Sequence, residues 1–358
     1  MKNINALVIE PSKTVRKRLE AAIAETPDIA LLGSTGLKNG TDLKAKITES
    51  PPDVLLLGID SKDSDEMEMF GYMRKNHSGI PILIMTHHNR NGAEIAISTL
   101  KKGAVEFFPK SSILSGAILD SNFFKNRVIP VIKAVPRLNR NILLNKQYFD
   151  NFVDSTDPIS SDYFKDSQPK IKLLSIVGCL GGVAPLYLLL SSLPNNLPVP
   201  VIVVQHMVEI YSEVLVEDLN RYASLTVKQA EDGEEIKPGS VYVAPGNYHV
   251  VTRRLKGKPV LKLDQRPKVA GFRPSIDIFL KSSTNLFGNK TLTVYLSGGG
   301  LDGIEGAKSM DFVGGQVIVQ NRNTSLLSDI SWKVESLGIN EGAYPLERLA
   351  HEICKRLI

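Results

Sequence analysis

Three polar residues in the second half of the chain, Cys179, His206 and Asp302, have the side chains of a nucleophile, a base and an orienting carboxylate. Each stands at or just beyond the end of an apolar run that we predict to be a strand. Because the carboxyl ends of parallel strands meet at one edge of an α/β sheet, we expect these side chains to converge there. His206 would take the proton of Cys179, or hold it in a thiolate–imidazolium pair, and Asp302 would fix the imidazole tautomer. The apolar runs are Leu173–Val177, Val199–Val204 and Leu292–Leu296.

The turn that carries Cys179 is rich in glycine and reads Ile176-Val177-Gly178-Cys179-Leu180-Gly181-Gly182. A helix-like run, Ala184–Leu193, follows it. Backbone N–H groups and the positive end of a helix dipole converge at such a junction, which favours a thiolate and provides an oxyanion site. The glycines at 298–300, after the strand that precedes Asp302, would let further N–H groups approach the same oxyanion.

Each of these residues also has a purely structural interpretation. Cys179 could be a small buried residue in a tight turn, and His206 could satisfy a backbone group at a strand end. Asp302, followed by Gly303, could be a turn residue or the N-cap of the next helix. Taken singly, the structural interpretation is favoured for each residue, whereas their joint placement favours a site.

Composition limits the class of protein. The chain has 358 residues, enough for two ordinary domains, and 42% hydrophobic with 23% charged residues is typical of a globular protein. The net charge of +5 is spread along the chain, so we expect no nucleic-acid partner. Two distant cysteines predict no disulfide framework and a reducing, cytoplasmic location. We expect no metal or cofactor, because no ligand spacing links His77, His87, His88, His249 and His351.

One stretch resembles a membrane span only because it lacks charged residues. From Leu173 to Val208 the sequence has no Asp, Glu, Lys or Arg, but prolines at 185, 194, 198 and 200 interrupt it. We therefore expect a buried β-α-β unit and no membrane insertion. The charged N-terminal residues also give no signal-peptide pattern.

Alternation of strand-like and helix-like runs predicts an α/β fold with two doubly wound domains. The first has predicted strands at Ala6–Ile9, Ala30–Leu32, Val54–Leu57, Ile82–Met85 and Glu106–Phe108, with a last helix within 113–134. The second, mostly parallel sheet begins near Ile171 and includes a hairpin at 250–263. Two further strands are predicted there, at Ser240–Ala244 and Gln316–Val319. We predict domains at 1–134 and 170–358, joined by a linker at 135–169 with a short helix near Leu143–Phe152.

The first domain resembles a response-regulator receiver, a flavodoxin-like parallel sheet. Its closing segment Gly103–Lys110 matches the family, with Lys110 as the family's lysine and Phe107 as its aromatic switch residue. Glu10 stands at the acidic pair and Thr86 at the hydroxyl position. Pro11 and Gly58 depart from the pattern at the second acidic residue and the phospho-acceptor.

A receiver needs a carboxylate at the acceptor position, both to be phosphorylated and to hold Mg²⁺. Gly58 supplies none, and the loop geometry argues against Asp60, two residues on, as its replacement. We therefore expect a degenerate receiver with a structural or docking role.

The rest of the chain resembles the chemotaxis protein-glutamate methylesterase (CheB) family. That resemblance implies hydrolysis of glutamate methyl esters on chemoreceptors, with deamidation of receptor glutamines as a second activity, and histidine kinases or other chemotaxis proteins as partners. It also implies Cys179, His206 and Asp302 as the triad, with Leu180, Gly181, Gly299 and Gly300 at the turns around the oxyanion. The matching segments are Ile176–Gly182, Val201–Met207, Ala230–Gly233, Pro238–Gly246, Tyr248-His249, Arg273–Asp277 and Leu296–Gly306.

The chain departs from this family at the chemistry. Cys179 replaces a serine, Leu180 a threonine, and Gly299 a methionine, and Asp329-Ile330-Ser331 stands where the family has Gly-Met-Pro. Two hypotheses follow: a hydrolase that works through a thioester on Cys179, or a catalytically inactive binding or scaffold protein. We favour the hydrolase, because His206 and Asp302 are retained. A redox-sensitive regulator is a third hypothesis, supported only by Cys179.

Overall fold

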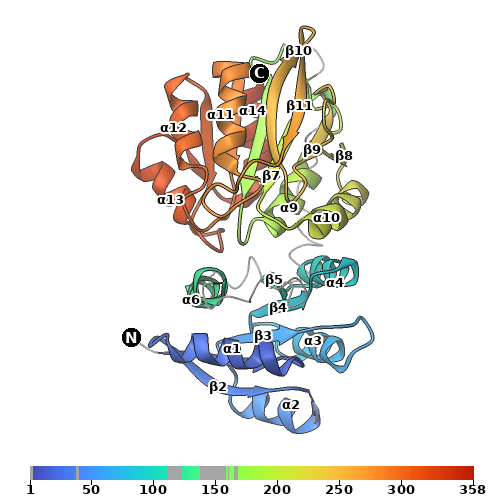
Figure 1. The fold of residues 1–358 in the computed structure, drawn as a ribbon, viewed down its shortest axis with the longest axis vertical. Helices are drawn as coiled ribbons and strands as arrows, with labels where there is room; N and C mark the ends of the chain where they lie inside the picture. Colours follow the sequence, from blue (N-terminus) through green and yellow to red (C-terminus); the bar gives the residue numbers. More distant parts are fainter. Residues whose placement is uncertain (1–2, 38–39, 111–122, 138–158, 160, 165–167) are drawn as a thin grey trace. The chain divides into compact units, whose positions relative to one another are not determined.

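The apolar runs of the first third of the chain form five parallel strands in a computed structural model (Figure 1), which describes residues 3–37, 40–110, 123–137, 159, 161–164 and 168–358. The chain divides into two compact units, Met1–Phe149 and Asp150–Ile358. The predicted linker at 135–169 lies mostly outside the described residues, as does its helix near 143–152. No helix among the described residues is long and apolar enough to cross a membrane.

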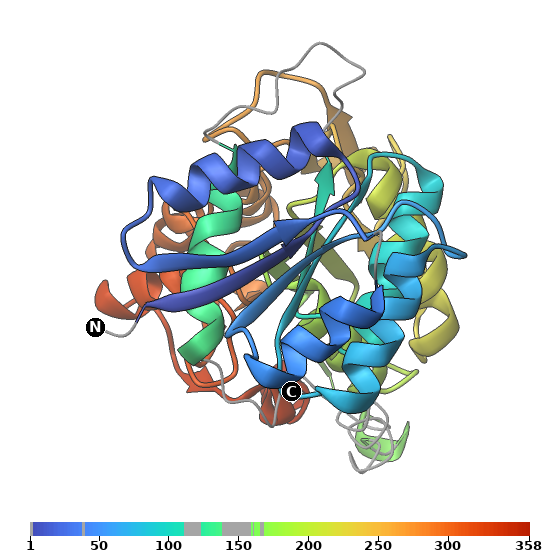
Figure 2. The ribbon, with the colours of Figure 1, turned by 90° about the horizontal axis from the view of Figure 1, so that it is seen from below.

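The first unit has the strand order β2-β1-β3-β4-β5, which is that of a doubly wound flavodoxin-like sheet. Figure 2 shows α1 and α6 on one face of this sheet and α3 and α4 on the other. All five predicted strands are confirmed, each a little longer than predicted. The elements are β1 (Ile4–Ile9), α1 (Lys13–Ala24), β2 (Ile29–Thr35), α2 (Gly40–Glu49), β3 (Val54–Gly58), α3 (Asp65–Asn76), β4 (Ile82–His87), α4 (Arg90–Lys101), β5 (Glu106–Lys110), a π-helix (Phe124–Val128), α6 (Ile129–Ala134) and a 3₁₀ turn (Val135–Arg137).

Local sequence explains these elements. β3 is buried along its whole length, as expected for a central parallel strand covered on both faces. α1 begins after Ser12, whose hydroxyl accepts a hydrogen bond from the backbone N–H of Val15, and its buried face carries Val15, Leu19, Ala22 and Ile23. The last predicted helix is helical from Phe124 to Ala134, and residues 113–122 lie outside the described part.

The second unit is built on a parallel seven-stranded sheet of order β14-β13-β12-β6-β7-β9-β8, with the separate antiparallel hairpin β10–β11. Figure 1 shows this hairpin beside α11. The elements are a 3₁₀ turn (Ser161–Phe164), β6 (Leu173–Gly178), α9 (Val183–Ser192), β7 (Val201–Gln205), α10 (Glu209–Tyr222), β8 (Thr226–Gln229), β9 (Ser240–Val243), β10 (His249–Leu255), β11 (Lys258–Asp264), α11 (Ile276–Phe287), a 3₁₀ turn (Gly288–Lys290), β12 (Thr291–Tyr295), α12 (Ile304–Phe312), β13 (Gln316–Gln320), α13 (Asp329–Ser336), β14 (Ala343–Tyr344) and α14 (Leu346–Leu357).

The sheet order positions the predicted triad. β6 pairs with β12 on one side and with β7 on the other. The strand order therefore reverses at β6, with later strands added on both of its sides. Parallel sheets form ligand-binding crevices at the carboxyl ends of strands where the order reverses in this way. Cys179 follows β6, His206 follows β7, and Asp302 lies in the loop after β12, so all three belong to this edge of the sheet.

Two strands were not predicted from the sequence. β8 has only one fully buried side chain among its four residues, and β14 is two residues long, so neither presents an apolar run. β7 begins two residues later than predicted, because Val199-Pro200 precedes it rather than belonging to it. These differences lie at the edges of the sheet and at one strand boundary, and leave the central strands as predicted.

Candidate active site

The turn after β6 is tied to both neighbouring strands. The backbone N–H of Cys179 donates to the carbonyl of Ser297 over 3.0 Å, at the end of β12. The Cys179 carbonyl accepts from the Gly182 N–H over 3.0 Å and from Nε2 of Gln205, at the end of β7, over 2.6 Å. Cys179 is 2% exposed. Its backbone is therefore fixed by the strands that lead to His206 and Asp302.

Gly181 is required by this turn in two ways. Its φ of 77° lies in the left-handed region. A Cβ at Gly181 would also lie 2.5 Å from both the Cβ of Leu326 and the Oγ of Ser297. Ser297 Oγ in turn donates to the Leu180 carbonyl over 2.9 Å. The turn can approach the β12 loop this closely only because it carries no side chain at this position.

We expect Gly181→Ala to lower the free energy of unfolding of the second unit more than Gly233→Ala does. Gly233 has a similar φ of 79° but has no atom within 4 Å of its Cβ position, so it is a matched control for backbone strain. Strain costs about 1–2 kcal/mol at either position, and the clash adds about 1–3 kcal/mol at Gly181. Guanidinium unfolding followed by Trp332 fluorescence measures both. Equal losses of unfolding free energy in the two variants would contradict this prediction and show that the turn can move to accommodate a side chain at Gly181.

His206 and Asp302 form a buried pair. Nε2 of His206 lies 2.7 Å from Oδ2 of Asp302, and their side chains are 3% and 0% exposed. The other ring nitrogen, Nδ1, is buried and has no nitrogen or oxygen partner within the described part of the chain, and the Cys179 side chain is hydrogen-bonded to the His206 side chain. The predicted base is therefore oriented by the predicted carboxylate, and its second nitrogen is left for proton exchange.

Asp302 is held by the start of α11. Its Oδ2 also accepts from the Ile276 N–H over 2.8 Å, and Oδ1 accepts from the Ser275 hydroxyl over 2.8 Å and the Asp277 N–H over 3.2 Å. A carboxylate at a helix N-terminus gains from the helix dipole as well as from these donors. Asp302 thus neither caps its own helix nor serves only as a turn residue, because the N-cap of α12 is Gly303.

The electrostatics of the pair favour the charged forms of both groups. Burial lowers the pKa of His206, but the interactions with Cys179 and with the Asp302 carboxylate outweigh it and raise that pKa to about 9. Burial likewise opposes ionisation of Asp302, yet the hydrogen bond and charge of His206 and the N–H of Ile276 hold its pKa below the usual value. The raised pKa of His206 favours its imidazolium form beside Cys179 and Asp302.

The four predicted oxyanion and turn residues lie around this edge. Leu180 is half-buried and Gly181 is buried in the Cys179 turn, while Gly299 is half-buried and Gly300 is exposed in the turn after β12. A Cβ at Gly299 would lie 3.0 Å from Cδ1 of Leu327 and 3.5 Å from Oδ2 of Asp329. The neighbouring Gly298 brings the two turns together, since its Cβ position is 3.2 Å from the Cβ of Cys179.

Sequence reasoning missed three residues that support the site. Gln205 holds the Cys179 carbonyl, Ser275 binds Asp302 and caps α11, and Phe272 stacks on His206 with ring centroids 3.7 Å apart. Ser275 had a usable signal, because a serine directly before an apolar-periodic segment is a typical N-cap. Nothing local to the sequence indicates the stacking of Phe272 or the reach of Gln205.

The receiver-like residues Glu10, Gly58 and Lys110 come together in the first unit. Lys110 Nζ lies 2.8 Å from Glu10 Oε1 and 2.5 Å from Asp60 Oδ1. A Cβ at Gly58 would lie 2.0 Å from Glu10 Oε2, so the glutamate occupies the space that a side chain at 58 would need. Burial raises the pKa of Glu10 although the charge of Lys110 opposes this.

Two further receiver positions are now located. Thr86 is fully buried in β4, one residue after Met85, which pairs with Gly58. Asp60, which we do not expect to replace the acceptor, lies beside Glu10 and Lys110, with its Oδ1 also 3.2 Å from Nε2 of His87. The short loop after β3 turns back far enough for its carboxylate to reach Lys110.

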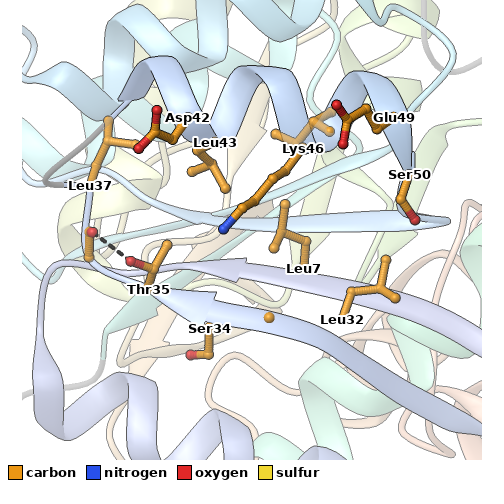
Figure 3. A pocket seen from close by; sticks show the side chains of 13 residues that line it. Leu7, Leu32, Ser34, Thr35, Leu37, Asp42, Leu43, Lys46, Glu49 and Ser50 are labelled. Atoms are coloured by element: carbon orange, nitrogen blue, oxygen red, sulfur yellow. Dashed lines mark hydrogen bonds between the residues drawn. The ribbon is translucent and has the colours of Figure 1, made fainter.

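The first unit also has a cavity of about 570 Å³ between β2 and α2. Figure 3 shows Leu7, Leu32 and Leu43 on its walls and the Lys46 side chain reaching across it. It contains none of the predicted site residues, and it belongs to a different unit from the triad.

Sequence comparison relates this chain to one family of known proteins. Residues 174–353 match the family model described as CheB methylesterase. A protein-glutamate methylesterase/protein-glutamine glutaminase from Thermotoga maritima is 30% identical over 356 residues, covering 99% of this chain and 98% of the relative. The equivalent protein from Trichodesmium erythraeum is 28% identical over the full length of both chains.

A solved structure of the CheB methylesterase catalytic domain of Thermotoga maritima superposes on this chain with a TM-score of 0.51. It is 34% identical and covers 52% of this chain and 98% of that domain. The family model covers the segments around Cys179, His206 and Asp302, and the full-length relatives also cover the receiver-like unit before them. The chain belongs to the CheB methylesterase family, with a receiver fold preceding the catalytic domain.

Proposed function

We propose that residues 170–358 hydrolyse glutamate methyl esters on chemoreceptor cytoplasmic domains, and deamidate receptor glutamines, through a Cys179–His206–Asp302 triad. The observation that carries this proposal is the buried 2.7 Å His206–Asp302 pair, together with the Cys179 side chain, which raises the pKa of His206 along with Asp302. The activity for which the full-length relatives are named supports the substrate class. Sulfur in place of serine oxygen makes the intermediate a thioester.

In the first half-reaction the Cys179 thiolate attacks the ester carbonyl carbon and a C–S bond forms. Backbone N–H groups of the Cys179 turn and of the Gly299-Gly300 turn stabilise the oxyanion. The C–O bond to methanol then breaks, and the imidazolium of His206 donates its proton to the departing methoxide. With a glutamine substrate, the same proton goes to the departing ammonia.

In the second half-reaction His206, now neutral, removes a proton from water as the water attacks the thioester carbonyl. The C–S bond breaks and the thiolate returns beside the imidazolium, while the glutamic acid product loses its carboxyl proton to solvent and is released as a carboxylate. Asp302 keeps the imidazole in one tautomer throughout and stabilises each imidazolium that forms. A reducing compartment keeps the thiol available for the next turnover.

A methanol-release assay tests this proposal, with full-length wild-type protein and Cys179→Ser on a methylated receptor fragment under reducing conditions. We expect wild-type turnover, and a slower Cys179→Ser, because the turn has adapted to sulfur and small displacements of a nucleophile cost large rate factors. Receptor binding with no methanol release from the wild type would instead establish the scaffold hypothesis.

We also propose that the receiver unit takes no phosphoryl group and serves as a docking domain for a kinase or another chemotaxis protein. The residues present do not fit the Mg²⁺ that a receiver binds, because Gly58 and Pro11 supply no oxygen ligand and the Lys110 ammonium bonds to both nearby carboxylates. No step of the proposed reaction passes through this metal.

Incubation with acetyl phosphate and Mg²⁺ is therefore expected to leave the mass of the full-length protein unchanged. Lys110 already neutralises Glu10 and Asp60, and a Gly58→Asp variant alone should not gain the modification because Glu10 fills its space. Intact-protein mass spectrometry measures the result. A phosphoryl adduct on the wild type that disappears in Asp60→Asn would contradict this prediction and identify Asp60 as the acceptor.

A further inference from the structure

The ring of Phe272 lies flat against the imidazole of His206. The ring centroids are 3.7 Å apart and the planes make an angle of 16°. Asp302 contacts this imidazole through its edge at Nε2, whereas Phe272 covers one of its faces. The π face of a phenyl ring carries negative charge density and therefore attracts a cation stacked on it.

The segment that carries Phe272 is firmly held. Val269 and Phe272 exchange backbone hydrogen bonds of 3.1 and 2.9 Å around Ala270 and Gly271, which both have positive φ, so a tight two-residue turn places Phe272 at its end. The next residue, Arg273, donates from Nη1 to the carbonyls of Gln265 and Arg266 and from Nη2 to Oδ1 of Asn247. The ring is thus fixed by its backbone.

The same segment continues into the groups that hold Asp302. Ser275, Ile276 and Asp277 follow Phe272 closely and donate to the Asp302 carboxylate. Residues 272–277 therefore contact both members of the pair, one through a ring face and the other through hydrogen bonds. This dual contact makes the segment a single support for the geometry of the base.

We propose that Phe272 is a positioning residue for His206, whose ring holds the plane of the imidazole against Asp302 and stabilises its cationic form. The catalytic consequence rests on the function proposed above, because the imidazolium is the acid that protonates the leaving group. Within the described residues, the charged groups that shift the titration of His206 are Cys179, from the turn after β6, and Asp302, from the loop after β12. Phe272 adds an uncharged ring to these two.

Histidine titration by NMR of the full-length chain, labelled with ¹³C-histidine, tests this proposal, with the His206 signal assigned by its loss in His206→Gln. We expect a wild-type midpoint near 9, and one lower by about one pH unit in Phe272→Leu, which keeps apolar bulk but has no π face. Phe272→Tyr should titrate like the wild type, because it keeps the ring. In Phe272→Leu, the pH at which methanol release declines on the alkaline side should also be lower by about one pH unit.

Phe287→Leu is the matched control. Phe287 is also a partly buried ring packed against the same core, but it ends α11, about 16 Å along the helix from Ile276. It should lose packing without shifting the midpoint. If Phe272→Leu does not fold, Phe272→Met takes its place.

A Phe272→Leu midpoint equal to that of the wild type, or an equal shift in Phe287→Leu, would overturn the inference. Its failure is separable from failure of the proposed function. A shifted midpoint in a protein that releases no methanol would leave Phe272 as the support of an inactive pair. Turnover with an unshifted midpoint would remove only the role of Phe272.

Discussion

Replacing Cys179 by alanine is expected to lower methanol release from methylated receptor by at least about 10⁵-fold, because it removes the atom that forms the thioester. What remains is the acceleration that binding and the oxyanion turns supply without a nucleophile. The Cβ that packs against Gly298 is kept, so the turn should retain its structure. The measurement is single-turnover methanol release at a saturating concentration of receptor fragment, with circular dichroism to compare the folds.

Cys354→Ala is the control for the loss of a thiol. Cys354 is fully buried in α14, and burial raises its pKa to about 12, so it stays a thiol and we expect it to take no part in the proposed reaction. Its replacement should leave the rate unchanged. Alkylation by iodoacetamide should likewise favour Cys179 over Cys354, and this preference should disappear in His206→Ala. Activity of Cys179→Ala within about tenfold of the wild type would exclude the thioester route.

Asp302→Asn is expected to lower kcat by roughly 10³- to 10⁴-fold, because the imidazole loses the group that sets its tautomer and stabilises its charge. The amide is a poor replacement for a second reason. Asp302 accepts from Ser275 and from the N–H groups of Ile276 and Asp277, and an amide NH₂ would face some of these donors with a donor of its own. A kcat within about tenfold of the wild type would contradict the assigned role.

The same substitution should destabilise the second unit by about 3–5 kcal/mol, because it breaks a buried ion pair. The pKa of His206 is raised above its unfolded value, so its contribution is complete below pH 6.5 and is lost as pH rises through about 9. The pKa of Asp302 is lowered, so its contribution is present above the unfolded pKa of 3.8 and is lost as pH falls through the folded value.

The difference in stability between wild type and Asp302→Asn should therefore be largest between about pH 4 and 6.5 and decrease toward pH 9. Guanidinium unfolding followed by Trp332, the only tryptophan and a residue of the second unit, gives this difference at each pH. A difference that grows from pH 6.5 to 9 would contradict the charge assignment.

The strand ends were enough to predict that Cys179, His206 and Asp302 lie at one edge of the sheet. Apolar runs mark β6, β7 and β12 clearly, because central parallel strands are buried on both faces. Cys179, His206 and Asp302 follow these strands. Because the strands are parallel, their carboxyl ends lie at one edge of the sheet, regardless of the conformation of the loops. The short strands β8 and β14 were not predicted, because a strand at the edge of a sheet buries few apolar side chains and so has no apolar run in its sequence.

The supporting contacts could not be predicted, because they depend on loop conformation rather than on periodicity. Phe272 reaches His206 through a turn whose shape depends on positive φ at Ala270 and Gly271, and alanine there gives no such signal. In the first unit, sequence identified Gly58 as lacking a nucleophile, but side-chain packing alone reveals that Glu10 fills its space and that Asp60 reaches Lys110.

A trapped intermediate tests the central claim most directly. Wild-type protein mixed with a peptide carrying a glutamate methyl ester, quenched in acid during turnover and analysed by mass spectrometry, should carry a peptide adduct on Cys179 that hydroxylamine removes. His206→Gln, in which deacylation lacks its base, should accumulate any adduct it forms, and Cys179→Ala should form none. Methanol release without an adduct on Cys179, or an adduct that persists in Cys179→Ala, would contradict a thioester mechanism at this residue.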